Sequence, residues 1–449
     1  MPQRLAARMP QRNIICLVNL PTGAFHKKGT RMKVVIDRNA FLKAVQVAQR
    51  GTNSSASLAV LSHVLLAADG GTMTISGTNL DMGIVTRAQA VVEKPGKIAI
   101  PAKLLASALG TLPAGNLTLE SGKYPNLSIT NEITRFNIKG LDASEFPEQA
   151  IFDETTALMI SCKTLHGMIK RTAFASAKDE SRPSLTGTFV EIQEDHISFA
   201  TADGFRLAIA EGEMVGKAPA PLTALIATKA MQEIALIGGA DSNLFGVLID
   251  SKAGIAIFST TDTDIICRLV DSRFPDYRQI LPKTSTTEIV VTLADINRVV
   301  SQAAVMARIG TQNAVVFNLT EGEDDGKPGS LVVKALSDAD GDTKAELMTD
   351  SHTGKPLTIA FNADYILQGL QAMSGEQVTI KMGTAKGPVL ITPAGDATLR
   401  YIVMPVSLPE VEVKKKTKTV PEAAPVAEIE QPAQLETAVV PSMEVAVVS

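Results

Sequence analysis

The chain is poor in aromatic residues. Phe, Tyr and Trp together make up 4% of its 449 residues, and Trp is absent. Proteins that bind single-stranded nucleic acid stack the bases on aromatic rings, so this composition argues against that mode of binding. The chain also lacks any apolar run close to the ~20 residues that cross a bilayer. Hydrophobic residues still reach 45%, and the length allows about three packed domains.

Cysteine and histidine are also scarce, which limits metal and redox chemistry. The three cysteines, Cys16, Cys162 and Cys267, lie far apart and are odd in number, and the five histidines are scattered. Neither a C-x-x-C pair nor an H-E-x-x-H motif occurs, so we expect no metal site. Reduced thiols in a cytoplasmic protein are the simplest interpretation.

Motifs for catalysis and nucleotide binding are missing as well. The segment Gly322–Pro328 is close to a phosphate-binding loop, but its spacing is wrong and Pro stands where a hydroxyl residue is needed. The acidic run Asp338–Asp342 faintly resembles a calcium loop, but Gly is missing at the sixth position of such a loop and a carboxylate at the twelfth, so an acidic turn is the better interpretation. Spacing alone indicates no catalytic nucleophile with its base. We therefore expect neither an enzyme nor a cofactor.

The two terminal segments differ in composition from the rest. Residues 1–31 carry scattered arginines around the apolar run Ile14–Leu20, which is too short for a signal peptide. We expect a disordered extension or a start codon assigned too early, with a targeting segment as the alternative. Residues 409–449 are rich in Pro, Ala, Glu and Val and include the basic patch Lys414–Lys418. We expect a disordered tail there, with the patch as a solvated charge run rather than a DNA contact.

Between these ends the same order of elements occurs three times, which predicts α+β domains at residues 32–153, 154–284 and 285–408. Each domain begins with a short strand and an amphipathic helix, and the three helices are expected at residues 37–50, 161–178 and 293–308. Their apolar faces carry Phe41, Val45 and Ala48, then Leu165, Ile169 and Thr172, then Ile296, Val300 and Ala303. Further antiparallel strands surround a second helix, at residues 101–109, 228–237 and 361–373. Many α+β chains can be divided in this way, but the first two units also close alike, at Phe146-Pro147 and Phe274-Pro275.

Basic residues are concentrated on these predicted helices. The six helices carry 11 basic and 4 acidic residues, although the whole chain has a net charge of −4. If the helices share one surface, that surface attracts the phosphate backbone of DNA without reading its sequence. The alternative is that basic residues merely suit helix exteriors, but it predicts acidic neighbours, and the helix at 161–178 has none. The candidate DNA-facing residues are Lys43, Arg50, Lys103, Lys163, Lys170, Arg171, Lys178, Lys229 and Arg298.

Four segments resemble one known protein family: Met32–Ile36, Thr201–Ala208, Ser272–Pro282 and Tyr401–Leu408. They are similar to the β subunit of bacterial DNA polymerase III, the sliding clamp, and the resemblance runs in order from residue 32 to residue 408. It implies three domains of one topology, and two chains that close head to tail into a six-domain ring. Helices would line the hole around duplex DNA, and sheets would form the outer wall.

The resemblance also implies two protein-binding surfaces. One is a pocket between the second and third domains for short linear peptides from the polymerase, the clamp loader and repair proteins. Its matching positions are Arg182, Leu185, Gly204, Phe205, Arg206, Leu207, Pro275, Ile280, Val403, Met404, Pro405 and Leu408. The other surface is a dimer interface, in which Arg135, Phe136 and Ile138 of one chain meet Val305 and Met306 of the other. The chain departs from the family pattern at Ser55, Ala202, Phe205 and Ser407, where relatives have a basic residue, Thr, His and a basic residue.

Taken together, these features favour a non-enzymatic clamp that encircles duplex DNA and tethers the replicative polymerase. The alternative is a β-rich repeat scaffold or peptide-binding protein that does not encircle DNA. The pocket residues Leu207, Ile280 and Val403 could equally be ordinary core residues. Arg206 is harder to explain in that way, because an unpaired arginine is rarely buried.

Overall fold

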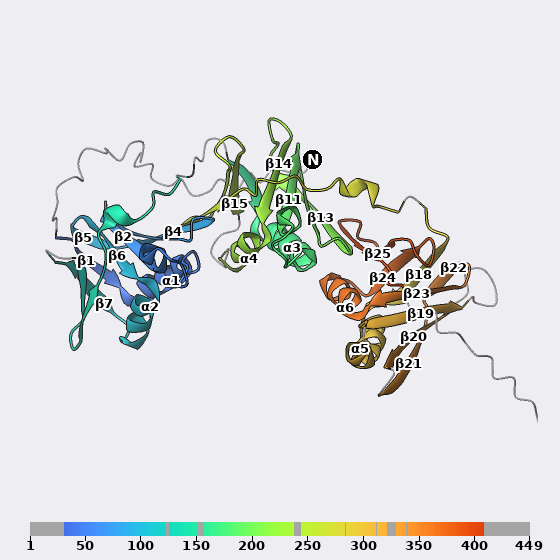
Figure 1. Ribbon diagram of the computed structural model, residues 1–449. Coiled ribbons are helices and arrows are strands. Elements are labelled where there is room, and N and C mark those ends of the chain that lie inside the picture. The colour runs from blue at the N-terminus through green and yellow to red at the C-terminus, as the bar shows by residue number, and fades with distance from the viewer. Residues whose placement is uncertain are drawn as a thin grey trace, which may run out of the picture. The chain divides into compact units, whose positions relative to one another are not determined.

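The computed structural model in Figure 1 describes residues 31–122, 125–150, 152, 157–237, 244–282, 284–310, 312–320, 329–337 and 340–407. Several predictions concern residues outside these ranges. They are the N-terminal extension up to residue 30, Cys16, the segment Gly322–Pro328, and the tail together with Leu408. The acidic turn is described only from Asp340 onward.

The first unit begins with strand β1 (Lys33–Asp37) and helix α1 (Arg38–Gln49), and its second helix is α2 (Ala102–Thr111). Its other strands are β2 (His63–Asp69), β3 (Thr72–Thr78), β4 (Met82–Gln89), β5 (Val91–Lys94), β6 (Gly96–Pro101), β7 (Asn116–Ser121), β8 (Asn126–Thr130) and β9 (Arg135–Lys139). One sheet has the order β5-β1-β7-β8-β9, and β2 pairs with β3 and β6 in the other.

The second unit repeats this order with β10 (Leu158–Ser161), α3 (Cys162–Thr172) and α4 (Thr228–Ile237). Its other strands are β11 (Gly187–Gln193), β12 (His196–Ala202), β13 (Arg206–Val215), β14 (Leu222–Ala227), β15 (Leu244–Asp250), β16 (Ile255–Ser259) and β17 (Thr263–Arg268). Three short 3-10 turns connect the elements: η3 (Ala173–Ala175), η4 (Pro183–Leu185) and η5 (Tyr277–Gln279).

The third unit has the same plan, with β18 (Thr287–Thr292), α5 (Leu293–Ile309) and α6 (Ala363–Ala372). Its other strands are β19 (Ala314–Thr320), β20 (Ser330–Ser337), β21 (Gly341–Met348), β22 (Ser351–Gly354), β23 (Leu357–Asn362), β24 (Gln377–Met382), β25 (Val389–Pro393) and β26 (Leu399–Val403). One sheet has the order β21-β20-β19-β23. The strand ladders among the described residues of all three units are antiparallel, which confirms the predicted α+β repeat.

Three of the helices begin at a polar residue that ends the strand before it. Asp37 accepts a hydrogen bond from the Ala40 amide, and Ser161 accepts one from the Thr164 amide. Asn362 caps α6 by accepting from the amides of Asp364 and Tyr365. Such caps satisfy N–H groups that have no partner inside the helix. The apolar faces predicted for the first helix of each unit are buried.

Most helix boundaries differ from the prediction by one or two residues, and two of the differences change the position of a residue named above. Helix α2 begins at Ala102, so Pro101 ends strand β6 instead of occupying the first helical turn. Helix α3 ends at Thr172, and the chain continues as the tighter turn η3. Lys178 therefore lies on a loop beyond the helix, because the α-helical hydrogen bonding stops before it.

Backbone ladders join the three units. Strand β4 pairs with β17, from Met82 opposite Cys267 to Thr86 opposite Thr263. Strand β13 pairs with β26, from Arg206 opposite Val403 to Ala210 opposite Leu399. At the first junction the buried Asp264 is paired with Arg87 and accepts a hydrogen bond of 2.6 Å from Ser259. Sheet hydrogen bonding thus continues across both junctions.

Cys162 and Cys267 are both buried and unpaired, which confirms free thiols at these two positions. Burial raises the pKa of both thiols, and that of Cys267 reaches about 12. Because the thiolate is the reactive form, the raised pKa lowers the reactivity of both side chains at neutral pH.

The packing of the third unit can be tested at one glycine, Gly369. A Cβ atom at Gly369 of α6 would lie 2.2 Å from Cε1 of Tyr401, whose ring is fully buried and whose hydroxyl donates to the Tyr365 carbonyl at 2.8 Å. Gly369→Ala should therefore destabilise this unit by about 1–3 kcal/mol, as overpacked cores do. Urea denaturation followed by circular dichroism measures the loss.

Gly167→Ala is the matched control, because Gly167 also lies inside a helix but a Cβ there meets no atom within 4 Å. Helix propensity predicts no loss, or a gain of up to about 1 kcal/mol. Equal denaturation curves for the two variants would contradict the close contact between Gly369 and Tyr401.

Candidate functional site

The helices of the described chain are neighbours across the unit boundaries. Within each unit the two helices pack together: α1 on α2, α3 on α4, and α5 on α6. Arg50, which follows α1, forms an ion pair of 2.9 Å with Glu233 on α4, and α3 contacts α6. The order of contact is therefore α2, α1, α4, α3, α6, α5. Such a row is what a shared basic surface requires.

The candidate DNA-facing residues are exposed, with the exception of the half-buried Arg171. Several have acidic partners nearby, such as Lys229 with Glu180 at 3.2 Å and Arg298 with Asp295 at 2.7 Å. Exposed pairs of this kind are weak, because water and salt screen them.

Helix α3 differs from the other helices. Lys163 and Lys170 are exposed and have no ion-pair partner among the described residues. They are seven positions apart and so lie on one stripe of the helix. Arg171 points elsewhere: its Nη1 lies 3.4 Å from Oδ2 of Asp396 and 3.2 Å from Oγ1 of Thr398, both in the third unit. Lys163 and Lys170 are thus available to phosphate, whereas Arg171 links two units.

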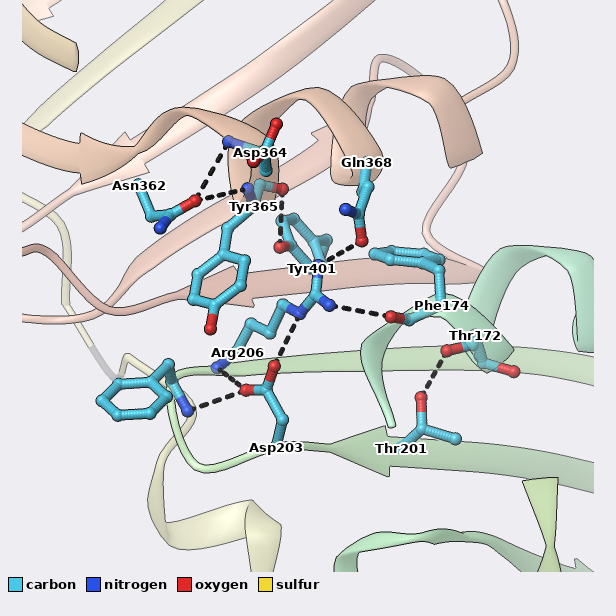
Figure 2. Close-up of polar contacts among 11 residues, drawn as sticks. Thr172, Phe174, Thr201, Asp203, Arg206, Asn362, Asp364, Tyr365, Gln368 and Tyr401 are labelled. Atoms are coloured by element: carbon cyan, nitrogen blue, oxygen red, sulfur yellow. Dashed lines mark hydrogen bonds and ion pairs between the residues drawn. The ribbon is translucent and has the colours of Figure 1, made fainter. Parts of the chain in front are cut away.

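The candidate pocket is built around the tight turn between β12 and β13, shown in Figure 2. Asp203 forms this turn, since its Oδ1 accepts hydrogen bonds from the amides of Phe205 and Arg206. Gly204 has a φ of +93°, a backbone conformation that side chains disfavour. The turn leaves the Phe205 ring 59% exposed.

The guanidinium of Arg206 is buried and fully surrounded by partners (Figure 2). Its Nε donates to Asp203 at 2.9 Å, its Nη1 to Oε1 of Gln368 at 2.8 Å, and its Nη2 to the Phe174 carbonyl at 2.9 Å. The guanidinium carbon also lies 4.4 Å from the ring centre of Tyr365 and 5.5 Å from that of Phe174. Arg206 is therefore a paired arginine, so burial alone does not mark it as a binding residue.

The third unit supplies the opposite wall of the candidate pocket. The Met404 amide donates to the Phe205 carbonyl at 2.8 Å, which continues the ladder between β13 and β26. The rings of Phe205 and Tyr365 stack at 6.4 Å between centres. Burial, and then the charge of Asp203, raises the pKa of Tyr365, so its phenol stays neutral. Phe205 and Tyr365 thus bring two aromatic rings together beside the turn.

The other predicted pocket residues differ in how far they are buried. Leu185 and Leu207 are buried in one cluster with Phe274, Tyr277 and Ile402. Val403 is buried, Met404 and Pro405 are half-buried, and Arg182, Pro275 and Ile280 are exposed. Nη1 of Arg182 lies 3.6 Å from the position that a Cβ of Gly204 would occupy. Leu408 lies outside the described residues.

Sequence reasoning missed several residues of this site: Asp203, Phe174, Tyr365, Gln368 and Tyr401. The Asp203-Gly204 pair is a turn signal that could have indicated the first. The three aromatic residues belong to a small set in this chain and deserved weight for that reason. Nothing local points to Gln368, which meets Arg206 from 162 positions away.

Strands β9 and β21 each end a sheet without a further partner in the described chain, as β5 and β23 do at the other ends of the same two sheets. Strand β9 pairs with β8, and strand β21 pairs with β20. The predicted interface residues lie on or near these edges: Arg135 is exposed, Phe136 is half-buried and Ile138 is buried. On α5, Val305 is 59% exposed, whereas Met306 packs partly against the core of its own unit. These residues occupy two different edges of the chain.

The described residues contain no group of three or more His, Cys, Asp or Glu side chains placed to hold a metal ion. No helix in those ranges is both long enough and apolar enough to cross a membrane.

Comparison with known proteins identifies the three units. Residues 32–150 match the N-terminal domain of the DNA polymerase III beta subunit, residues 159–276 match its central domain, and residues 278–407 match its C-terminal domain. The chain is 30% identical over 385 residues to the beta sliding clamp of Synechococcus elongatus, with 84% of this chain and 100% of the relative covered.

Solved structures show the same fold. The sliding clamp of Bacillus subtilis has a TM-score of 0.80 at 23% identity and covers 84% of this chain and 100% of its own. The Pseudomonas aeruginosa sliding clamp bound to griselimycin has a TM-score of 0.77 at 25% identity and covers 85% of this chain and 100% of its own. With its three clamp domains matched in order, the chain belongs to the bacterial beta sliding clamp family, the beta subunit of DNA polymerase III.

Proposed function

We propose that two copies of this protein close head to tail into a ring around duplex DNA. The ring tethers the replicative polymerase, and it receives the clamp loader and repair proteins through short linear peptides that enter the pocket at Phe205 and Met404. It has no catalytic site of its own, requires no cofactor and acts in the cytoplasm, where bacterial DNA is replicated. We also propose the domain limits 32–153, 154–284 and 285–408 for the three units.

The row of helices is the observation that carries this proposal. It runs through all three units, and on α3 it presents Lys163 and Lys170 without acidic partners among the described residues. Phosphate attraction of this kind is independent of sequence and nearly uniform along a duplex. A protein that holds DNA in this way can slide along it.

The unpaired edges at β9 and β21 support the head-to-tail assembly. An interface between β9 of one chain and β21 of the next uses different surfaces of the two copies, so it is heterologous and must close to avoid an open polymer. Exposed strand edges are templates for pairing with another chain. The exposed side chains Val305 and Leu336 lie in the third unit near its edge, and they would be covered in such a dimer.

A topological experiment separates a ring from a scaffold. Loaded on a nicked circular plasmid with its clamp loader and ATP, the protein should remain bound through a high-salt wash, because a closed ring does not need contact energy to stay on. A single cut in the plasmid at constant salt should release it from the ends within minutes. Gel filtration of the protein–DNA complex measures retention.

A scaffold that binds DNA by surface charge behaves in the opposite way. It dissociates from DNA in high salt, and cutting the plasmid does not change the amount that stays bound. Equal retention on circular and linear DNA would rule out encirclement, whatever the family relationship.

Charge reversal on α3 tests the DNA-facing surface. Lys163→Glu with Lys170→Glu should weaken direct binding to short duplex DNA and reduce the slope of log K against log salt by about 2, because each lost phosphate contact removes about 0.9. Fluorescence anisotropy over a salt series gives the slope. Lys252→Glu with Lys355→Glu changes the same charge on exposed loops and should leave the slope nearly unchanged. Equal slopes for the two variants would place α3 away from DNA.

The dimer interface is tested at Val305 rather than Met306, since Met306 also packs inside its own unit. Val305→Asp should shift the protein from dimer to monomer, because the interface would bury an unpaired carboxylate. Leu236→Asp is the control: Leu236 is 63% exposed on α4, away from both edges. Light scattering at micromolar concentration gives the mass. A monomeric unmodified protein would contradict the head-to-tail ring.

A further inference from the structure

We propose that Arg206 is a positioning residue of the peptide pocket: it holds the two walls in register and does not itself contact the partner. This inference rests on the proposed peptide-binding function. It assigns the buried network of Asp203, Phe174, Tyr365 and Gln368 a part in the affinity of the pocket, although these side chains need not touch a peptide.

The first wall is the turn that carries Phe205. Asp203 accepts from the amides of Phe205 and Arg206 with one carboxylate oxygen, and it accepts from Nε of Arg206 with the other. One carboxylate therefore fixes the backbone of the turn and the direction of the guanidinium together. Any displacement of the guanidinium acts directly on the turn.

The second wall belongs to the third unit, and Arg206 reaches it in two ways. Its backbone pairs with Val403 in the ladder that leads to Met404. Its Nη1 donates to Gln368 on α6, and its planar face lies over the ring of Tyr365 from the same helix. The ladder alone would allow α6 to tilt about the strand. The contacts of Arg206 to α6 restrict that tilt and so fix the separation between Phe205 and Tyr365.

The third hydrogen bond of the guanidinium is made within the second unit. Nη2 donates to the carbonyl of Phe174 in η3, directly after helix α3. The three nitrogens therefore connect three separate segments, each with a hydrogen bond of 2.8–2.9 Å. Hydrogen bonds that involve a charged group are stronger and more directional than neutral ones, which suits a rigid junction.

Burial separates this role from direct recognition of a peptide. Arg206 is 7% exposed, with Tyr365 and Phe174 on its faces. If it swung out toward an acidic partner residue, it would leave the Asp203 carboxylate without its counter-ion, and such a half-buried charge is strongly disfavoured. Phe205, on the same turn, is largely exposed and meets the partner instead. The pocket should therefore select apolar and aromatic side chains here, and Arg206 should add nothing to the binding of an acidic residue.

The test uses two fluorescein-labelled synthetic peptides, Gln-Leu-Ser-Leu-Phe and Gln-Leu-Asp-Leu-Phe, which differ by one negative charge. Gln368→Leu removes the hydrogen bond of Arg206 to α6, and it leaves the contact with the Tyr365 ring and the ion pair with Asp203 in place. We expect it to weaken both peptides by the same factor, roughly tenfold, mainly through faster dissociation. Fluorescence anisotropy gives the affinities, and stopped-flow displacement gives the dissociation rates.

Two further variants distinguish positioning from general damage. Asp203→Asn places an amide donor against Nε of Arg206 and should weaken both peptides equally. Its effect should be less than additive with Gln368→Leu, because both act through one guanidinium. Gln377→Leu is the matched control: it removes one exposed hydrogen bond, to Asp350, in the same unit and should leave affinity unchanged. Thermal denaturation of Gln368→Leu should match that of Gln377→Leu.

Several outcomes overturn the proposal. A loss confined to the acidic peptide would show that Arg206 contacts the partner directly. Unchanged peptide affinity in Gln368→Leu would show that the network does not control the affinity of the pocket. Strictly additive losses of affinity in the double variant with Asp203→Asn would show the same. If neither the unmodified protein nor Met404→Ala binds either peptide, the pocket itself is absent. That result would refute the proposed peptide-binding function, and it differs from the outcomes that refute only the role of Arg206.

Discussion

The backbone ladders between units are the interaction on which the other features of this molecule depend. Strand β4 continues into β17, and β13 continues into β26, so two junctions are made of the same hydrogen bonds as the sheets themselves. Main-chain pairing does not require particular side chains. This independence accounts for a fold that is kept among relatives at 23–30% identity. Without the second ladder the row of helices would stop at α3, and the turn at Phe205 would face no opposite wall.

The distribution of charge follows from this arrangement. The chain is acidic overall, with a net charge of −4, yet the helices are basic. The exposed ion pairs on the helices are mostly accessible to water, so they dampen the local field only slightly. In the proposed ring, an acidic remainder would disfavour DNA on the other faces of the protein, and the basic helices would be the surface that attracts phosphate.

Local pattern in the sequence was sufficient for the repeat and for most helices, because periodicity depends on near neighbours. The face of Phe41, Val45 and Ala48 is an example, and its burial is confirmed. Boundaries were less accurate: Pro101 ends a strand, and Lys178 lies beyond its helix. The polar network around Arg206 was beyond such reasoning. Its partners come from segments 32 and 162 positions away, and only the fold determines that they meet.

The unpaired edges β9 and β21 have a consequence for assembly geometry. A heterologous contact repeated from copy to copy closes only if the rotation per copy divides a full turn evenly. In a ring of two copies, a rotation of half a circle must therefore relate one copy to the other. The angles at the two junctions within each chain and at the contact between chains together determine that rotation. A small angular change at β4–β17 or β13–β26 would leave every local contact intact and still produce an open helical filament. A closed ring therefore requires a defined angle at these junctions as well as sufficient strength.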